Sequence, residues 1–287
     1  MVAADAVFPA FLTRSVKLGI ARQVAGLFND QARSERPVAR HSDDGLFGPQ
    51  SVARRVHGDV TSMLVGGIAA LMLQMLHPAV LVGVWEHSKF RTDMHSRLRR
   101  TARFIALTTY GGRAEAEAAI ERVRRIHDRV RGTLSNGCTY SGNDPTLLAW
   151  VHVAEATSFL DAWIRYAEPA MSAADQDRYF AEVAQIASAL GAAPVPRSRS
   201  DARLLINALR PYLRCDARTR RIARLVLTNP APSIMLEPLR VITTEAALEL
   251  LPVWARRMHG FAVPTLHSLL VRAGTRGMAR TLRWAFE

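Results

Sequence analysis

Apolar residues recur along most of this chain at three- and four-residue intervals, which is the spacing of one face of an α-helix. The alternation of apolar and polar positions that marks a half-buried strand is absent, and no segment repeats at a fixed period. Loops rich in proline and small polar residues separate the helical runs of the second half. The pattern therefore predicts an all-α protein with one globular core of about nine to twelve helices.

The most apolar segment covers residues 60–85, which contain no Asp, Glu, Lys or Arg. Its length is sufficient for a membrane span. His77 and Pro78 interrupt the segment near its middle, and proline cannot continue a helix without a break. We therefore expect a buried helix that breaks at His77, with a membrane span as the alternative. In the buried helix, His77 is expected to hydrogen-bond to the backbone carbonyls that the break frees.

Three helices with well-marked ends follow. Asp93 is a good N-cap for a helix that ends at residues 111–112, which are both glycine. The next helix carries acidic residues at its start and arginines at its end, as the helix dipole favours, and is expected to stop at Gly132. Asp144 and Pro145 then open a third helix as its N-cap and first residue.

The chain divides into three parts by pattern. Residues 1–50 are expected to form an N-terminal amphipathic helical extension, which either packs on the body or lies on a lipid surface. Residues 51–260 form the main all-α domain, and residues 261–287 form a basic C-terminal helical tail. The N-terminus lacks the continuous apolar stretch of a signal peptide. We expect a cytoplasmic location, with membrane association as an option.

Composition narrows the class of protein further. Of the 287 residues, 49% are hydrophobic and 22% are charged, which excludes a disordered chain and a multi-span membrane protein. The formal net charge is +13, but the arginines that dominate it are scattered along helices rather than clustered, so we do not expect a nucleic-acid partner. The two cysteines, Cys138 and Cys215, form no CxxC pair, which argues against a disulfide framework or a cysteine zinc site.

The sharpest candidate for chemistry is His127. It continues an apolar stripe that also contains Ala116, Ile120, Val123 and Val130, while charged residues occupy the other faces of the helix. The imidazole therefore points inward. An inward histidine is either a core residue or a metal ligand, and spacing alone leaves both open. A histidine that faces an apolar pocket is also what a five-coordinate haem iron needs.

A second candidate is the helix face that carries Arg97, Arg100 and Thr101. Arginine cannot lose its charge, so an inward arginine needs an anionic partner such as a haem propionate. The same residues also fit an exposed basic helix. His152 lies on the following helix, three residues before Glu155, and is expected to be a core polar residue or a neighbour of the group that His127 binds.

Other sites receive less support. Glu86, His87, Asp93 and His95 could supply a non-haem iron site, but the order Asp-x-His is the reverse of the usual one. A di-iron bundle needs Glu-x-x-His motifs on two helices, and none is present. The nucleotide-binding, zinc-protease and α/β-hydrolase motifs are also missing from the chain.

Three stretches together resemble a known family. They are GGIAALMLQMLHPAVLVGVWEHSKFRTDMHSRLRRT, RVRRIHDRVRGT and YSGNDPTLLAWVHVAEATSF. They look like the domain shared by the MpaB-type oxygenases and the rubber oxygenase called latex-clearing protein. The resemblance is strong from about Arg55 to Tyr166 and continues weakly to about Gly260. Its most specific elements are LQMLHP, the Arg-x-x-basic-Thr pattern and the Ile-His-x-x-Val-x-Gly pattern.

The resemblance implies a haem b cofactor in an all-α, globin-like core. By the IHDRVRG match, His127 is the proximal iron ligand, and Arg97 and Thr101 correspond to residues of the distal pocket. Arg100 stands where rubber oxygenase has a distal lysine, and arginine cannot serve as an amine ligand to iron. Glu86 is a candidate for that enzyme's catalytic glutamate.

The resemblance also implies the activity, a haem-dependent dioxygenase-like oxidation or cleavage of a lipophilic, isoprenoid-type substrate by O2. The apolar segment at residues 60–85 would then help to line the substrate channel. Two alternatives remain. One is a non-catalytic haem- or lipid-binding protein of the same fold, peripheral to membranes. The other is a basic helical protein without a cofactor that binds a membrane surface or nucleic acid.

Overall fold

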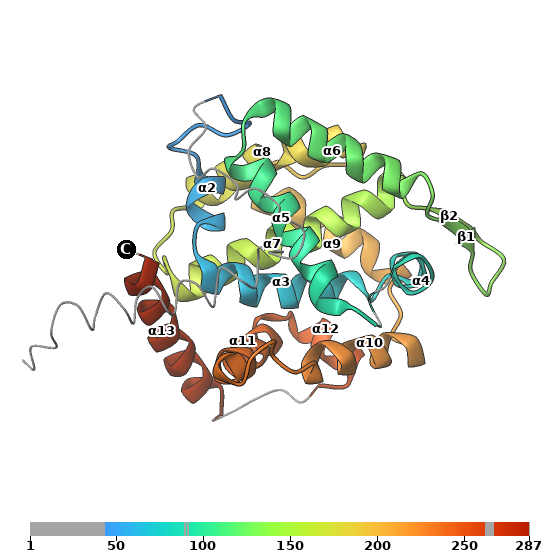
Figure 1. Cartoon of the computed structure of the whole chain (residues 1–287). Helices are drawn as coiled ribbons and strands as arrows, with labels where there is room; N and C mark the ends of the chain where they lie inside the picture. The colour runs from blue at the N-terminus through green and yellow to red at the C-terminus, as the bar shows by residue number, and fades with distance from the viewer. Residues whose placement is uncertain (1–43, 89, 91, 262–266, 287) are drawn as a thin grey trace, which may run out of the picture.

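The computed structural model describes residues 44–88, 90, 92–261 and 267–286. Within this part of the chain the protein is built from α-helices, with one small two-stranded antiparallel sheet, which confirms the all-α prediction (Figure 1). The elements are α2 (Val52–His57), α3 (Val60–Gln74), α4 (Pro78–His87), α5 (Met94–Tyr110), α6 (Arg113–His127), β1 (Arg131–Thr133), β2 (Thr139–Ser141), α7 (Pro145–Tyr166), α8 (Ala173–Leu190), α9 (Arg199–Leu209), α10 (Ala217–Thr228), α11 (Glu237–Leu250), α12 (Val253–His259) and α13 (His267–Phe286), with two short 3₁₀ turns, η3 (Arg210–Tyr212) and η4 (Ile234–Leu236).

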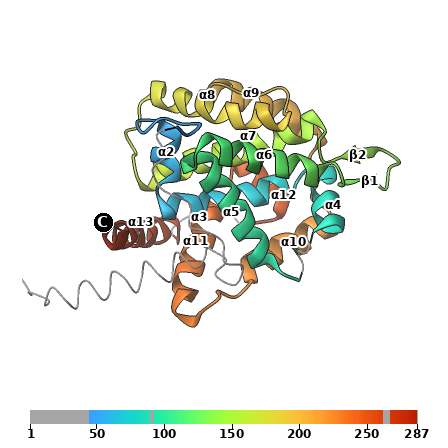
Figure 2. The same ribbon diagram turned by 45° about the horizontal axis from the view of Figure 1, so that its top comes forward.

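Helices α3 and α7 pack against each other through the middle of the molecule. Helices α8 and α9 lie on one side of this central pair and α10, α11 and α12 lie on the other, as the second view confirms (Figure 2). The two central helices approach closely because Gly66 of α3 has no side chain: a Cβ there would lie 2.9 Å from Phe159 Cα and 2.9 Å from the Ser158 carbonyl oxygen of α7. This contact explains why an apolar helix contains a glycine at that position.

The apolar segment breaks where the sequence predicts. Helix α3 ends at Gln74, α4 begins at Pro78, and the two axes are bent by 106°. No single helix in the described ranges is long and apolar enough to cross a membrane, and α3 and α4 meet the length and composition criteria only as this bent pair. The two helices instead border the protein core, to which many of their side chains contribute.

The predicted role of His77 at the break is wrong. Its side chain makes no capping hydrogen bond to α4, and its Nδ1 atom is buried without a hydrogen-bond partner in the described part of the chain. Other groups satisfy the freed carbonyls: the Trp150 indole donates to the Gln74 oxygen at 3.3 Å, and the Arg214 backbone N–H donates to the Leu76 oxygen at 2.8 Å. Because donors from α7 and from the segment before α10 bond to these carbonyls, the side chain of His77 is not needed as their donor.

Helices α5 and α6 form a hairpin joined at residues 111–112. Asp93 caps α5 as predicted, since its carboxylate accepts a hydrogen bond from Ser96 N at 3.1 Å. The hairpin packs on α2 and α8, near the end where the two helices join. Helix α6 ends at His127, five residues before the predicted stop at Gly132, because the chain turns there and enters β1.

The C-terminal helix α13 packs along α11 and α3. The Arg283 guanidinium donates to the Asp59 carboxylate at 2.8 Å and to the Tyr166 carbonyl at 2.9 Å, so this helix is tied to the start of α3 and to the end of α7. The predicted division at residues 50 and 260 stays a prediction. The amphipathic extension expected at residues 1–50 falls mostly outside the described residues.

Candidate functional site

His127 occupies the last position of α6 and faces the interior, as the apolar stripe predicts. Ala116 and Ile120 of that stripe are buried, and Val123 and His127 are half-buried. The imidazole has no hydrogen-bond partner among the described residues, and its Nδ1 atom is buried. A buried ring nitrogen without a partner is unusual in a folded protein, because such groups are nearly always satisfied.

The backbone around His127 is held by the chain that follows the β-hairpin. Gly142 lies so close that a Cβ there would be 2.8 Å from the His127 carbonyl oxygen and 3.2 Å from its Cα. The next residue, Asn143, donates from Nδ2 to the Asp128 carboxylate at 2.6 Å and to the Arg124 carbonyl at 3.2 Å. The end of α6 is therefore clamped to the start of α7, and the position of the imidazole is well defined.

Arg97 of α5 is the charged neighbour of His127. Its guanidinium donates to Ser88 Oγ at 3.0 Å and lies 5.4 Å from the centre of the Phe90 ring, and no carboxylate in the described part of the chain pairs with it. Burial, helped by the charge of Arg100, lowers the pKa of Arg97 to about 10. Burial and the charge of Arg97 also lower the pKa of His127, while Asp128 acts in the opposite direction. Among the described residues, the site thus combines a neutral imidazole with a half-buried cation that pairs with no carboxylate.

The other two residues of the predicted trio lie differently. Arg100 and Thr101 are exposed on α5. Arg100 donates to Ser96 Oγ at 3.2 Å, and the Thr101 hydroxyl donates to the Arg97 carbonyl at 3.3 Å. The structure therefore brings Arg97 to His127 and leaves Arg100 and Thr101 at the surface. Their proposed catalytic roles stay predictions.

Helix α7 contributes two further ionisable groups to the interior. Burial lowers the pKa of His152 to about 4 and raises the pKa of Glu155 to about 7. His152 Nε2 is buried without a hydrogen-bond partner among the described residues. Both side chains nevertheless keep some accessible surface.

A cluster that the sequence did not point to lies at the far end of the α5–α6 hairpin. His57 Nδ1 is 2.9 Å from Thr109 Oγ1, and His57 Nε2 is 3.0 Å from the Tyr179 hydroxyl. Burial lowers the pKa of His57 to about 4. These three residues come from α2, α5 and α8, so no local motif marked them, and only the packing of the helices brings them together.

The four residues considered for a non-haem iron site, Glu86, His87, Asp93 and His95, do not form a metal-binding group. The Tyr140 hydroxyl donates to Glu86 at 3.1 Å and lies 3.4 Å from His87, whereas His95 contacts Asn229 and Asp93 caps α5. Across the described residues, no group of three or more His, Cys, Asp or Glu side chains could hold a metal ion. Burial and the Glu86 carboxylate raise the pKa of Tyr140. The four residues instead fasten α4 to the β-hairpin and α5 to the loop after α10.

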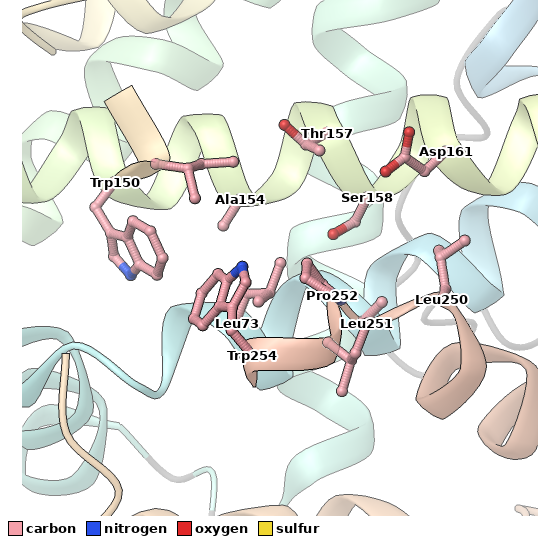
Figure 3. Close-up of a pocket in the computed structure, with 12 residues that line it drawn as sticks. Leu73, Trp150, Ala154, Thr157, Ser158, Asp161, Leu250, Leu251, Pro252 and Trp254 are labelled. Carbon is pink, nitrogen blue, oxygen red and sulfur yellow. The ribbon is translucent and has the colours of Figure 1, made fainter. Parts of the chain in front are cut away.

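A small cavity of about 20 Å³ lies between α3, α7, α9 and α12 (Figure 3). Leu73, Trp150 and Trp254 belong to its apolar wall, and Thr157 and Asp161 lie on its α7 side. Thr157 Oγ1 is buried without a partner. The volume is enough for about one water molecule. None of the predicted site residues lines this cavity, so it is separate from the His127 region.

Comparison with known proteins gives one result. No curated protein and no solved structure matches the chain significantly. A family profile described as "ER-bound oxygenase mpaB/B'/Rubber oxygenase, catalytic domain" matches residues 54–284. This range runs from α2 into α13 and contains every site residue discussed above. The chain therefore belongs to the mpaB/rubber oxygenase catalytic-domain family, and it is an oxygenase.

Proposed function

We propose that this oxygenase holds haem b through His127 and uses O2 to oxidise or cleave a lipophilic substrate of the isoprenoid type. The proposal rests on the juxtaposition of His127 and Arg97 at the open end of the α5–α6 hairpin. Among the described residues, an inward imidazole without a hydrogen-bond partner lies beside Arg97, a half-buried cation that pairs with no carboxylate. An iron–porphyrin with propionate groups supplies what both residues lack, a metal for the imidazole and anions for the guanidinium.

The residues of this region fit haem in their chemistry. A neutral imidazole is the common proximal ligand of haem iron, and the lowered pKa of His127 keeps its ring neutral at physiological pH. Arginine binds carboxylates strongly because its charge and its fork of donors match the anion. Arg100 cannot supply an amine ligand, so a lysine-capped resting state is not part of the proposal.

When bound, haem supplies the oxygen binding and redox chemistry. Residues of the chain would have three roles: His127 would hold the iron, Arg97 would neutralise a propionate, and the apolar side chains of α3 would exclude water. Helix α3 contains no ionisable residue and lies at the centre of the core. A wall of this kind favours a substrate that is itself apolar.

The test of the cofactor is the visible spectrum of the purified protein, oxidised and after dithionite and carbon monoxide, with haem quantified per chain. We expect about one haem per chain and a Soret band that shifts with carbon monoxide. His127→Ala should abolish stoichiometric binding. His152→Ala should largely retain it, and His95→Ala, at a histidine hydrogen-bonded to Asn229, should retain it fully.

Two results would contradict the cofactor proposal. One is a colourless wild-type protein that takes up no added haemin. The other is a His127→Ala variant with the wild-type spectrum. The substrate class has its own test, which is O2 consumption by the haem-loaded protein in the presence of polyisoprenoids, with carbonyl products identified by mass spectrometry. Absence of substrate-dependent O2 uptake across linear isoprenoids would reject that class.

A further inference from the structure

Positive charge is concentrated in residues 210–236, a segment that runs through η3, α10 and η4. The segment contains one acidic residue, Asp216, which caps α10 by accepting from Thr219 N at 2.8 Å. Its arginines are all exposed, and they are Arg210, Arg214, Arg218, Arg220, Arg221 and Arg224. This part of the surface therefore presents a large excess of positive charge to whatever it contacts.

The arginines of α10 are not neutralised by the protein itself. Within the described ranges they contact an aromatic ring and a carbonyl group but no carboxylate. Arg218 and Arg221 lie over Trp85 of α4, 5.9 and 5.5 Å from the ring centre, and Arg220 donates to the Cys215 carbonyl at 3.3 Å. The opposite face of α10 is buried in the body. The exposed face is thus free to meet an anionic partner.

Large apolar side chains stand out in the loop that follows α10. Ile234 and Met235 of η4 are 86% and 73% exposed, and Val241 of α11 is 45% exposed. In Figure 2 the chain between α10 and α11 extends beyond the rest of the body at its lower edge. Single exposed apolar residues are common, but neighbouring ones on a projecting loop indicate contact with an apolar medium.

This loop is held in place by hydrogen bonds to the end of α10. The Glu237 carboxylate accepts from Ala231 N at 3.0 Å and from the Arg240 guanidinium at 2.7 Å. Arg240 also donates to the Leu227 carbonyl of α10 at 2.7 Å. Because these bonds connect both ends of the loop to its neighbours, the folded structure itself presents the two apolar side chains of η4 outward.

We propose that the α10–η4 surface, formed by the exposed arginines of α10 together with Ile234 and Met235, docks on an anionic lipid bilayer. The arginines meet the lipid phosphates, and the two apolar side chains enter the boundary between headgroups and acyl chains. A nucleic acid would also attract the arginines, but it offers no apolar phase to the projecting loop. Docking gives the enzyme access to a lipophilic substrate; that purpose rests on the proposed function, whereas the surface does not.

The test is co-sedimentation of the full chain with vesicles of phosphatidylcholine, alone or mixed with phosphatidylglycerol. We expect stronger binding to the mixed vesicles, and binding that weakens as the salt concentration rises. Ile234→Ser combined with Met235→Ser should lower the partition coefficient by about tenfold or more, because the apolar contact is lost. Arg220→Gln combined with Arg224→Gln should lower it by about tenfold or more, because two charges near the lipid surface are lost.

Matched controls come from the α9 side of the molecule, across the central helix pair from α10 (Figure 2). Leu204→Ser changes an apolar side chain that is 66% exposed, and Arg197→Gln combined with Arg203→Gln removes two exposed charges. Both controls should bind mixed vesicles as the wild type does. Equal binding by the wild type and the Ile234–Met235 variant would overturn the proposal, as would a wild type that does not bind mixed vesicles.

A fluorescent label locates the contact. A dye that is sensitive to polarity is attached at Ile234→Cys in a chain that also carries Cys138→Ser and Cys215→Ser. Its emission should shift to the blue when mixed vesicles are added, whereas the same dye on the native, exposed Cys138 of the β-hairpin should not respond. A protein that binds vesicles while the dye at position 234 stays unchanged uses another segment for the contact, which would overturn the proposal.

Two further results would assign the surface to another partner and overturn the lipid proposal. One is an arginine variant that loses binding to duplex DNA while its vesicle binding stays at the wild-type level. The other is an Ile234–Met235 variant with a changed oligomeric state in size-exclusion chromatography and unchanged vesicle binding. These measurements need neither haem nor substrate, so a failed haem assignment and a failed docking surface give different results.

Discussion

Two kinds of buried ionisable side chain meet inside this protein, and their ionisation affects stability in opposite pH ranges. Burial lowers the pKa of His57 and His152 to about 4 and raises the pKa of Glu155 to about 7. The histidines therefore reduce stability as the pH falls from 6.5 through 4, since the unfolded chain binds their protons first. Glu155 reduces stability as the pH rises from 4.5 through 7. Between about pH 4 and pH 7 all three side chains are neutral in the folded protein.

Glu155→Gln is expected to stabilise the protein at alkaline pH. Below about pH 4.5 the carboxyl is protonated in both the folded and the unfolded state, so the substitution should have little effect there. Above pH 7 the wild type must ionise a buried group, and the variant should be more stable by roughly 3 kcal/mol at most, from the 4.5-to-7 shift. Urea denaturation at pH 4.5 and pH 8 measures the difference. Glu117→Gln, on the exposed face of α6, is the control, and equal gains in both variants would contradict the argument.

Arg97→Ala is expected to weaken haem retention without unfolding α5. The side chain supplies a half-buried positive charge next to His127, while the helix keeps its Asp93 cap. Haem transfer to apomyoglobin should be faster than in the wild type by about tenfold or more, the loss expected for one charge-assisted contact. Arg100→Ala removes an exposed arginine from the same helix and should have a smaller effect. If haem leaves Arg97→Ala and the wild type at the same rate, Arg97 is a solvated surface residue that does not help to hold haem.

Among the elements, the α3–α7 contact determines how closely the core can pack. Two adjacent glycines of α3 differ in what surrounds them. A Cβ at Gly66 would lie 2.7 Å from a Phe159 ring carbon and 2.9 Å from two backbone atoms of α7, whereas a Cβ at Gly67 would meet only a Phe159 ring carbon at 3.8 Å. Backbone atoms cannot move aside as a flexible side chain can, so the two positions are not equivalent.

Gly66→Ala is therefore expected to destabilise the protein, and Gly67→Ala is its matched control. The first change forces α3 and α7 apart, for which overpacking costs of about 1–3 kcal/mol are typical. The second change adds a methyl group with room to spare and gains helix propensity of up to about 1 kcal/mol. Thermal unfolding followed by circular dichroism measures both. Equal stabilities for the two variants would mean that α3 and α7 are not held at this distance.

For the molecule as a whole, α13 is linked to the start of α3 through one partly buried ion pair. Arg283 on α13 reaches Asp59, whose side chain is only 3% exposed and which also caps α3 by accepting from Ser62 N at 2.8 Å. The same guanidinium bonds to the Tyr166 carbonyl at the end of α7. A single arginine therefore connects the C-terminal helix to both central helices.

Arg283→Ala should lower the free energy of unfolding by about 2–4 kcal/mol, because it leaves the buried Asp59 carboxylate without its charged partner. Arg280→Ala, one turn earlier and exposed, should change it by about 0.5 kcal/mol or less. Guanidinium denaturation gives both values. A small effect at Arg283 would show that α13 contributes little to the stability of the core.

Much of this architecture could be predicted because its signals are local. The break between α3 and α4, the caps at Asp93 and Asp144, and the inward direction of His127 all follow from neighbouring residues and helical spacing. The predicted end of α6 at Gly132 is wrong, because Gly142 and Asn143, which follow the β-hairpin, pack against the backbone at the end of α6. A helix end set by a distant segment leaves no trace in its own sequence.

The sequence by itself determined the helical class, the family and which side of α6 carries its histidine, since helical periodicity and short motifs are properties of adjacent residues. Only the tertiary structure decided which residues of α5 reach that histidine, where the carbonyls freed at the helix break find donors, and that His57, Thr109 and Tyr179 come together. Those outcomes depend on how separate helices pack. The pKa values inside the protein depend on the same packing, because burial and neighbouring charges are set by residues far apart in the chain.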